Sequence, residues 1–264
     1  MTVVQLLATN AAALIALFAL FWLVTLKTRD VTPIDSVWAL GMVALGWTSF
    51  VQSSGDPTRK ALLMTICTIW GVRLGGYLLW RWRRNGPDRR YVTMFSKAKD
   101  AKGWGFNQAS FRLVYAIQAP LLFIVCLPVQ LGQINPAPPV GALGEVGAAI
   151  AVVGILLETI ADLQLAAFRR DAANAGKVLS SGLWRYSRHP NYFGEACVWW
   201  GLYLIAAESM TGRWALFGPV LLTYTLLKWS GVPTIEGRMK RKKPDYEAYV
   251  RRTSGFVPWF PKSA

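Results

Sequence analysis

Gly182-Leu-Trp-Arg-Tyr-Ser-Arg-His-Pro-Asn-Tyr-Phe-Gly-Glu195 contains two arginines, the only histidine of the chain, an asparagine, two tyrosines and a carboxylate. The apolar run 192–207 begins inside this stretch, so its basic half is expected at a membrane surface and its glutamate inside the membrane helix. Polar groups at such a border are costly unless they serve a function. We therefore interpret the stretch as a binding site for an anionic cofactor that carries adenosine.

The composition is that of a membrane protein. The chain has 264 residues, of which 53% are hydrophobic, and a mean hydropathy of +0.31. These values are typical of an integral membrane protein rather than of a soluble domain. The formal net charge is +15, and the basic residues cluster between apolar runs. No nucleic-acid-binding motif accompanies that charge, so no nucleic-acid partner is predicted.

About seven apolar runs approach the roughly 20 residues that a membrane-crossing helix needs. They cover residues 6–26, 34–51, 61–80, 111–131, 142–168, 192–207 and 214–229. Basic residues follow the first, third, fifth and seventh runs, whereas the alternate loops are poor in charge. Because basic loops face the cytoplasm, the pattern predicts an all-α bundle with its N-terminus outside and its C-terminus in the cytoplasm.

No repeat or linker divides the chain, so residues 1–264 are expected to form a single membrane domain. Within it, we assign helices of residues 1–131 to the substrate side and residues 142–264 to the cofactor-binding half. The expected location is a multi-pass position in a bacterial inner membrane, with the cofactor site facing the cytoplasm. The three cysteines and single histidine have no metal-ligand spacing, so neither a disulfide framework nor a metal site is predicted.

Ionisable residues within the apolar runs are candidates for function. Asp35 begins the second run, and Arg73 and Tyr77 lie four residues apart on one helix face of the third. Glu158 and Asp162 have the same spacing in the fifth run, where two carboxylates repel unless a cation or a hydrogen-bond donor lies between them. Taken singly, such residues serve equally well to lock helices together or to extend towards the interface.

A group drawn from both sides of one basic loop is more informative. Asp162 and Arg169 lie near the end of the fifth run, and Asn191 and Glu195 at the start of the sixth. Four polar residues at the adjoining ends of two neighbouring membrane helices favour a binding site there. The chain has neither a phosphate-binding P-loop nor the glycine-rich turn of soluble dinucleotide-binding domains, so a dinucleotide would be bound by another device.

At these residues the sequence resembles the steroid 5-alpha-reductase family, in particular its bacterial branch. The resemblance rests on residues 181–195 and on the closing pattern from Glu236 through Tyr246 and Tyr249 to Phe256-Val-Pro-Trp-Phe260. The core Arg188-His-Pro-Asn-Tyr-Phe-Gly194 is also similar to that of the sterol C14 and C7 reductases. The resemblance is strong over about residues 158–260 and weak before them.

The resemblance implies a seven-span membrane enzyme that uses NADPH to transfer a hydride to the beta carbon of an enone, as in a 3-oxo-4-ene steroid. The positions that match cofactor contacts or motif residues of the family are Arg84, Asp162, Arg169, Tyr186, Arg188, His189, Asn191, Tyr192, Glu195, Lys228 and Glu236. Arginine and lysine would offset the phosphate charge. Asn191 and Asp162 would hold amide or ribose groups.

Hydride transfer is the chemistry of the cofactor, so the protein must position the enone and polarise its oxygen. The steroid enzymes are credited with a glutamate in the second span and a tyrosine in the third. Here Asp35 is the nearest candidate for the glutamate, and Tyr77, or else Trp70, for the tyrosine. A steroid or another apolar lipid is the expected substrate, membrane lipids are the expected surroundings, and no protein partner is inferred.

Two other functions are compatible with the residues. Isoprenylcysteine and phospholipid methyltransferases share a related Arg-His-Pro-x-Tyr core and bind S-adenosylmethionine, but that cofactor carries no phosphate and would leave many cations unused. A non-enzymatic lipid-binding or scaffold protein would keep the basic surface without needing Asp35, Asp162 and Glu195 in the spans. The number of cations, with Asn191 and Glu195, favours the reductase.

Overall fold

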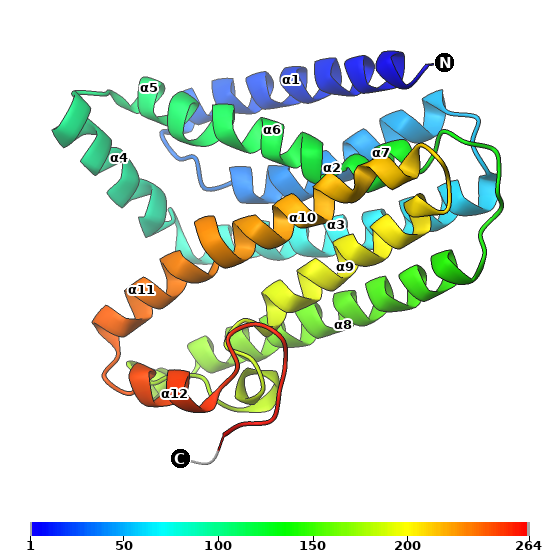
Figure 1. Cartoon of the computed structure of the whole chain (residues 1–264). Helices are drawn as coiled ribbons and strands as arrows, with labels where there is room; N and C mark the ends of the chain where they lie inside the picture. The colour runs from blue at the N-terminus through cyan, green and yellow to red at the C-terminus, as the bar shows by residue number, and fades with distance from the viewer. Residues whose placement is uncertain (1, 263–264) are drawn as a thin grey trace.

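The computed structural model describes residues 2–262, and every regular element within them is a helix. The long helices are α1 (Val3–Thr28), α2 (Ile34–Gln52), α3 (Pro57–Asn85), α8 (Ala142–Arg170) and α9 (Pro190–Ala207). They run alongside one another as an elongated bundle (Figure 1). The prediction of an all-α fold is therefore confirmed.

Shorter helices complete the chain. They are α4 (Arg89–Lys102), α5 (Phe106–Ser110), α6 (Ala116–Val125), α7 (Leu127–Leu131), α10 (Phe217–Tyr224), α11 (Val232–Lys242) and α12 (Tyr246–Arg252). Two π-helical turns, η1 (Phe111–Tyr115) and η5 (Thr225–Trp229), join α5 to α6 and extend α10. Three 3₁₀ turns, η2 (Ala172–Asn174), η3 (Gly182–Arg185) and η4 (Gly212–Leu216), lie in the loops beside α9.

Five helices of the described chain are long and apolar enough to cross a membrane. They are Val3–Thr28, Ile34–Gln52, Pro57–Asn85, Phe106–Val125 and Ala142–Arg170. The predicted sixth and seventh spans, α9 and α10 with η5, also run along the bundle in Figure 1 but fall outside this set. The reason is physical, because α9 begins with polar residues and α10 has only eight residues between irregular turns. The count of seven and the orientation stay predictions.

The segments that carry most of the basic residues meet at one end of the bundle. Figure 1 shows α4, α11, α12 and the C-terminus there, and the N-terminus at the opposite end. We call the end that holds α4, α11, α12 and the C-terminus the basic end. This arrangement agrees with the alternation of basic and uncharged loops that the sequence displays.

The closest helix pair is α8 with α9, and glycines make the close approach possible. Gly147 and Gly154 of α8 lie against Gly201 and Gly194 of α9. A Cβ atom at Gly154 would lie 2.6 Å from the carbonyl oxygen of Gly194. Small residues allow helix backbones to approach closely in membranes, where packing and hydrogen bonds replace the hydrophobic effect. The packing sets the carboxylates of α8 beside the polar start of α9.

We expect Gly154→Ala to lower the free energy of unfolding by about 1–3 kcal/mol, the usual effect of adding atoms to a packed contact. Gly76→Ala is the matched control, because Gly76 is helical and nothing lies within 4 Å of a Cβ there. That control measures the gain in helix propensity alone. Thermal unfolding in detergent measures both variants. Equal midpoints would show that the α8–α9 contact tolerates a methyl group.

Candidate functional site

A partly buried arginine joins the two carboxylates of α8. Arg73 of α3 lies 2.5 Å from Glu158 and 2.9 Å from Asp162, measured from its two terminal nitrogens to the nearest carboxylate oxygens. Glu158 and Asp162 are both buried. Because adjacent carboxylates repel, this cation makes their spacing of four residues tolerable. The spacing of the two carboxylates predicts a cation or a hydrogen-bond donor between them, and Arg73 of α3 is that cation.

Two neutral donors complete this group. The indole nitrogen of Trp70 donates to Glu158 at 3.0 Å, and the amide nitrogen of Asn191 donates to Asp162 at 3.3 Å. Trp70 is itself held by the edge of Trp199, with ring centroids 5.2 Å apart. Side chains of α3, α8 and α9 thus meet inside the bundle. We call the set Arg73, Glu158, Asp162, Asn191 and Glu195 the carboxylate cluster.

Glu195 is the member of this cluster without a partner. It lies one helical turn after Asn191, is only 8% exposed, and makes no hydrogen bond to the described residues 2–262. It is close enough to Glu158, Arg73 and Asp162 to interact with them electrostatically. The Glu195 carboxyl group keeps some solvent exposure and has lone pairs free to accept hydrogen bonds. Glu195 therefore fits a ligand that brings N–H donors, such as a carboxamide.

A second polar group forms where α2 and α4 begin. The hydroxyl of Tyr91 donates to Asp35 at 2.6 Å, and Arg90 donates to the other oxygen of Asp35 at 2.8 Å. Gln118 donates to the Tyr91 hydroxyl oxygen at 3.3 Å. Arg81 of α3 also approaches Asp35, at 3.9 Å. We call the set Asp35, Arg81, Arg90 and Tyr91 the Asp35 cluster.

The N-terminus of α4 is fixed by local hydrogen bonds. The Asp88 side chain accepts from the backbone N–H of Arg90 at 2.8 Å, which is the usual bond of an N-cap. The backbone N–H of Asp88 in turn donates to the Thr32 hydroxyl at 2.9 Å, which ties α4 to the segment before α2. These contacts place Tyr91 over Asp35. Burial raises the pKa of the Tyr91 hydroxyl well above its ordinary value, and the Asp35 carboxylate adds to the rise, so Tyr91 keeps its proton at neutral pH.

Tyr192 connects the two clusters. Its ring stacks on the His189 ring with centroids 5.6 Å apart and an interplanar angle of 7°. It is close enough to Arg90, Asp35 and Glu195 to interact with them electrostatically. Polar groups of α2, α3, α4, α8 and α9 therefore converge on one region at the basic end.

Exposed cations surround this region. Arg84 lies over the Trp80 ring at 5.8 Å, and Lys228 is exposed on η5. Arg169 lies in the last turn of α8, within electrostatic range of Tyr77 and Arg81. None of Arg84, Arg169 and Lys228 forms an ion pair with an acidic residue of the described chain. Free cations of this kind are suited to phosphate groups.

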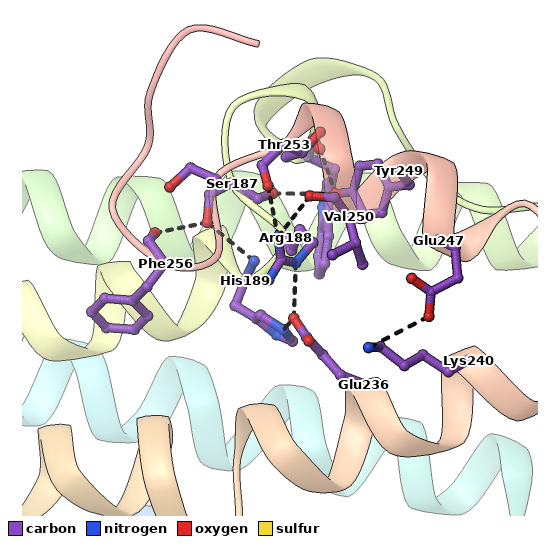
Figure 2. Close-up of polar contacts among 12 residues, drawn as sticks. Ser187, Arg188, His189, Glu236, Lys240, Glu247, Tyr249, Val250, Thr253 and Phe256 are labelled. Carbon is purple, nitrogen blue, oxygen red and sulfur yellow. Dashed lines mark hydrogen bonds and ion pairs between the residues drawn. The ribbon is translucent and has the colours of Figure 1, made fainter. Parts of the chain in front are cut away.

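The side chains of Arg188 and His189 both contact Glu236, and their role as cofactor contacts stays a prediction. Figure 2 shows both side chains directed at Glu236 of α11. The Arg188 Nε donates to Glu236 at 2.8 Å, and the His189 Nε2 lies 3.2 Å from the same oxygen. A terminal nitrogen of Arg188 also donates to the backbone oxygen of Thr253 at 2.7 Å. The two residues thus fasten the C-terminal segments to the start of α9.

We expect Glu236 to make stability depend on acid pH. Its hydrogen bond with His189, and then that with Arg188, lowers the pKa of Glu236 from 4.5 to about 2. A lowered pKa in the folded state contributes stability above the unfolded pKa, and this contribution, at most about 3 kcal/mol, is lost as pH falls towards the folded pKa. Glu236→Gln should therefore be less stable than the natural chain near neutral pH.

The gap in unfolding midpoint between the natural chain and Glu236→Gln is expected to shrink as pH falls through the window between 4.5 and about 2. Glu247→Gln is the control, because Glu247 is exposed and pairs only with Lys240 at 3.4 Å. A gap that stays constant with pH would show that the Glu236 carboxylate does not carry this stability.

Comparison with known proteins identifies the family. A family model described as a protein of unknown function (DUF1295) matches residues 21–253. The chain belongs to the DUF1295 family. This is a steroid 5-alpha-reductase-like membrane family, loosely linked to membrane reductases and methyltransferases, and no specific activity is shown for it. A curated protein of Schizosaccharomyces pombe, described as uncharacterized, is 23% identical, with 90% of this chain and 75% of its own length covered. No solved structure matches significantly.

In this DUF1295 protein the residues expected from the sequence fall into three places. Asp162, Asn191 and Glu195 belong to the carboxylate cluster, with Tyr192 beside it. Arg84, Arg169 and Lys228 lie on the exposed basic end, as does Tyr186, which is half-exposed against Phe260. Arg188, His189 and Glu236 bind one another.

The two residues expected to be catalytic do not meet. Tyr77 is half-buried on α3 and stacks on Trp80 at 6.0 Å, and no hydrogen bond joins it to Asp35 in the described chain. Trp70 is engaged with Glu158. Tyr91, which sequence reasoning missed, contacts Asp35 instead. The local signal for this position is the helix start Asp88-Arg-Arg-Tyr91, in which Asp88 is an N-cap residue.

Proposed function

We propose that this protein is a membrane-embedded reductase that uses NADPH to saturate the C=C bond of an enone lipid, such as a 3-oxo-4-ene steroid. The observation that carries the proposal is the hydrogen-bonded pair Tyr91–Asp35, which Tyr192 connects to the unpartnered carboxyl group of Glu195. Both lie beside helices that are long and apolar enough to cross a membrane. A proton donor, a polar ligand site and an apolar surrounding are what enone reduction needs.

The residues present fit the cofactor. Glu195 lacks a donor and Asn191 carries an amide, and this pair suits the carboxamide of a nicotinamide. Arg84, Arg169 and Lys228 lack acidic partners in the described chain and suit the phosphates. When bound, NADPH supplies the hydride that adds to the beta carbon of the enone. The chain has to orient the cofactor and stabilise the charge that develops on the enone oxygen.

Tyr91 is the proposed donor to that oxygen. As the C=C electron pair moves towards the enone oxygen, the Tyr91 hydroxyl stabilises the enolate by a hydrogen bond, and water then provides the proton for the alpha carbon. Tyr91 has a single O–H, which in this structure points to Asp35, so it must turn towards the substrate. Asp35 and Gln118 hold the hydroxyl in place. This assignment replaces Tyr77 by Tyr91 beside Asp35.

A methyltransferase is the second candidate, because the family is linked to both activities. S-adenosylmethionine is cationic at its sulfur and has no phosphate. Glu195 would suit that cation, but the single carboxylate of S-adenosylmethionine would leave most of the charge of Arg84, Arg169 and Lys228 without an anionic partner.

The melting temperature in detergent separates the two functions. A ligand that binds only the folded state stabilises it by about 2.7 kcal/mol at a hundred times its dissociation constant. We expect NADPH to raise the melting temperature and S-adenosylmethionine to leave it unchanged. Arg169→Ala and Asn191→Ala should reduce the NADPH shift, since they remove a phosphate and a carboxamide contact. Stabilisation by S-adenosylmethionine alone would refute the proposal.

A further inference from the structure

The C-terminal tail, residues 253–262, is ordered by its backbone while its largest side chains face outwards. The backbone N–H of Trp259 donates to the Tyr186 oxygen at 3.0 Å, and the backbone N–H of Lys262 donates to the Arg252 oxygen at 2.9 Å. The Ser187 hydroxyl donates to the Phe256 oxygen at 2.7 Å. Figure 2 shows the tail looping beside the start of α9.

The side chains of this tail are unusually exposed for their type. Trp259 is 69% exposed, Phe260 is 77% exposed and Val257 is 55% exposed. Trp259 and Phe260 contact each other with ring centroids 6.3 Å apart, so they form one apolar patch rather than scattered positions. A continuous exposed aromatic patch on a fixed backbone indicates a surface that contacts an apolar partner, such as the interior of a lipid bilayer.

Unpaired cations border the patch. Arg185, Arg251 and Arg252 are exposed, and none of them forms an ion pair with an acidic residue of the described chain. Aromatic residues prefer the level of lipid headgroups, and arginines near them are attracted to anionic lipids. At the same end of the bundle, Trp80 of α3 and Trp229 of η5 are also exposed, as expected of an interfacial belt.

We propose that the tail is a lipid-docking element, in which Trp259 and Phe260 insert at the headgroup level while Arg185, Arg251 and Arg252 bind anionic lipid headgroups. The occupant is the bilayer that surrounds the bundle, since the patch lies at the end where the candidate spans α3 and α8 finish. The inference does not depend on the proposed reductase activity.

The test uses the full chain in lipid nanodiscs of phosphatidylcholine alone or with an equal amount of phosphatidylglycerol. A bimane label is attached at Trp259→Cys in a Cys197→Ala background, because Cys67 and Cys126 are buried and Cys197 is the most accessible natural cysteine. The control label is at Ala173→Cys, which is exposed in the loop after α8. Quenching by lipids nitroxide-labelled at the headgroup is compared with quenching by aqueous iodide.

We expect lipid nitroxides to quench the label at position 259 and iodide to quench the label at position 173. With phosphatidylglycerol present, changing Arg185, Arg251 and Arg252 to glutamine should lower the docking equilibrium constant of the tail about a hundredfold, because each cation near an anionic surface contributes about fivefold. A second label at Phe260→Cys should give the same result, which would show that the quenching at position 259 does not come from a local folding defect of that variant.

Equal iodide quenching at positions 259 and 173 in both nanodiscs would show that the tail is solvated and would overturn the proposal. Lipid quenching that is the same with and without phosphatidylglycerol would overturn the role of the three arginines. Lipid quenching that requires the anionic lipid and the arginines would support it.

Discussion

Replacing Arg73 by methionine is expected to destabilise the protein by about 3–5 kcal/mol, the effect of removing one partner from a buried ion pair. Arg73 is the only cation that the structure places within ion-pair distance of Glu158 and Asp162 in residues 2–262. Without it the two carboxylates of α8 would repel each other inside the bundle. Thermal or denaturant unfolding in detergent measures the loss.

The same variant is expected to weaken NADPH binding at least tenfold, because Asp162 would no longer be held beside Asn191. Arg83→Met is the matched control, since Arg83 is exposed near the end of the same helix. Adding Glu158→Gln to Arg73→Met removes one of the repelling charges and should restore part of the stability. An Arg73→Met variant as stable as Arg83→Met would contradict the role of Arg73 as the cation that separates the charges of Glu158 and Asp162.

Replacing Tyr91 by phenylalanine is expected to lower the turnover number by about 10²–10³, the effect of removing a donor to a developing oxyanion. Phenylalanine keeps the ring against Phe95 and loses only the hydroxyl that reaches Asp35. The dissociation constant of NADPH should stay the same, because Tyr91 is not among the proposed cofactor contacts. Steady-state turnover with an enone substrate and NADPH titration measure the two quantities.

Tyr77→Phe is the control for this experiment, because Tyr77 stacks on Trp80 and has no hydrogen bond to Asp35 in the described chain. It should change turnover by less than about threefold. Asp35→Asn should lower turnover, because a neutral amide cannot accept hydrogen bonds from both Tyr91 and Arg90 as the Asp35 carboxylate does. A large loss in Tyr77→Phe together with an active Tyr91→Phe would restore Tyr77 as the donor.

Long apolar runs were predictable because a membrane helix is a local property of the sequence. The run 6–26 lies inside α1, and 142–168 lies inside α8. The run 111–131 was predicted as one helix, whereas the structure interrupts it at Cys126 and resumes it as α7. Pro128 lacks the backbone N–H that an unbroken helix uses, which explains the interruption just before it, whereas Pro120 is accommodated inside α6.

Contacts between distant residues were harder to predict. Asp162 and Asn191 were selected correctly as neighbours, since both flank one loop. The partner of Arg188 lies 48 residues further along the chain, and no local pattern identifies Glu236 as that partner. Tyr91 and Asp35 are 56 residues apart and meet only because α4 folds back over the start of α2. Tertiary packing, rather than periodicity, decides such pairs.

Deuterium transfer tests the central claim most directly. The purified protein is incubated in nanodiscs with NADPH that carries deuterium at the transferred position and with a panel of enone lipids that includes a 3-oxo-4-ene steroid. We predict a saturated product with one deuterium at the carbon beta to the ketone, detected by mass spectrometry, and its loss in Tyr91→Phe. No deuterated product from any enone of the panel, with methyl transfer from S-adenosylmethionine to a lipid in its place, would contradict the account.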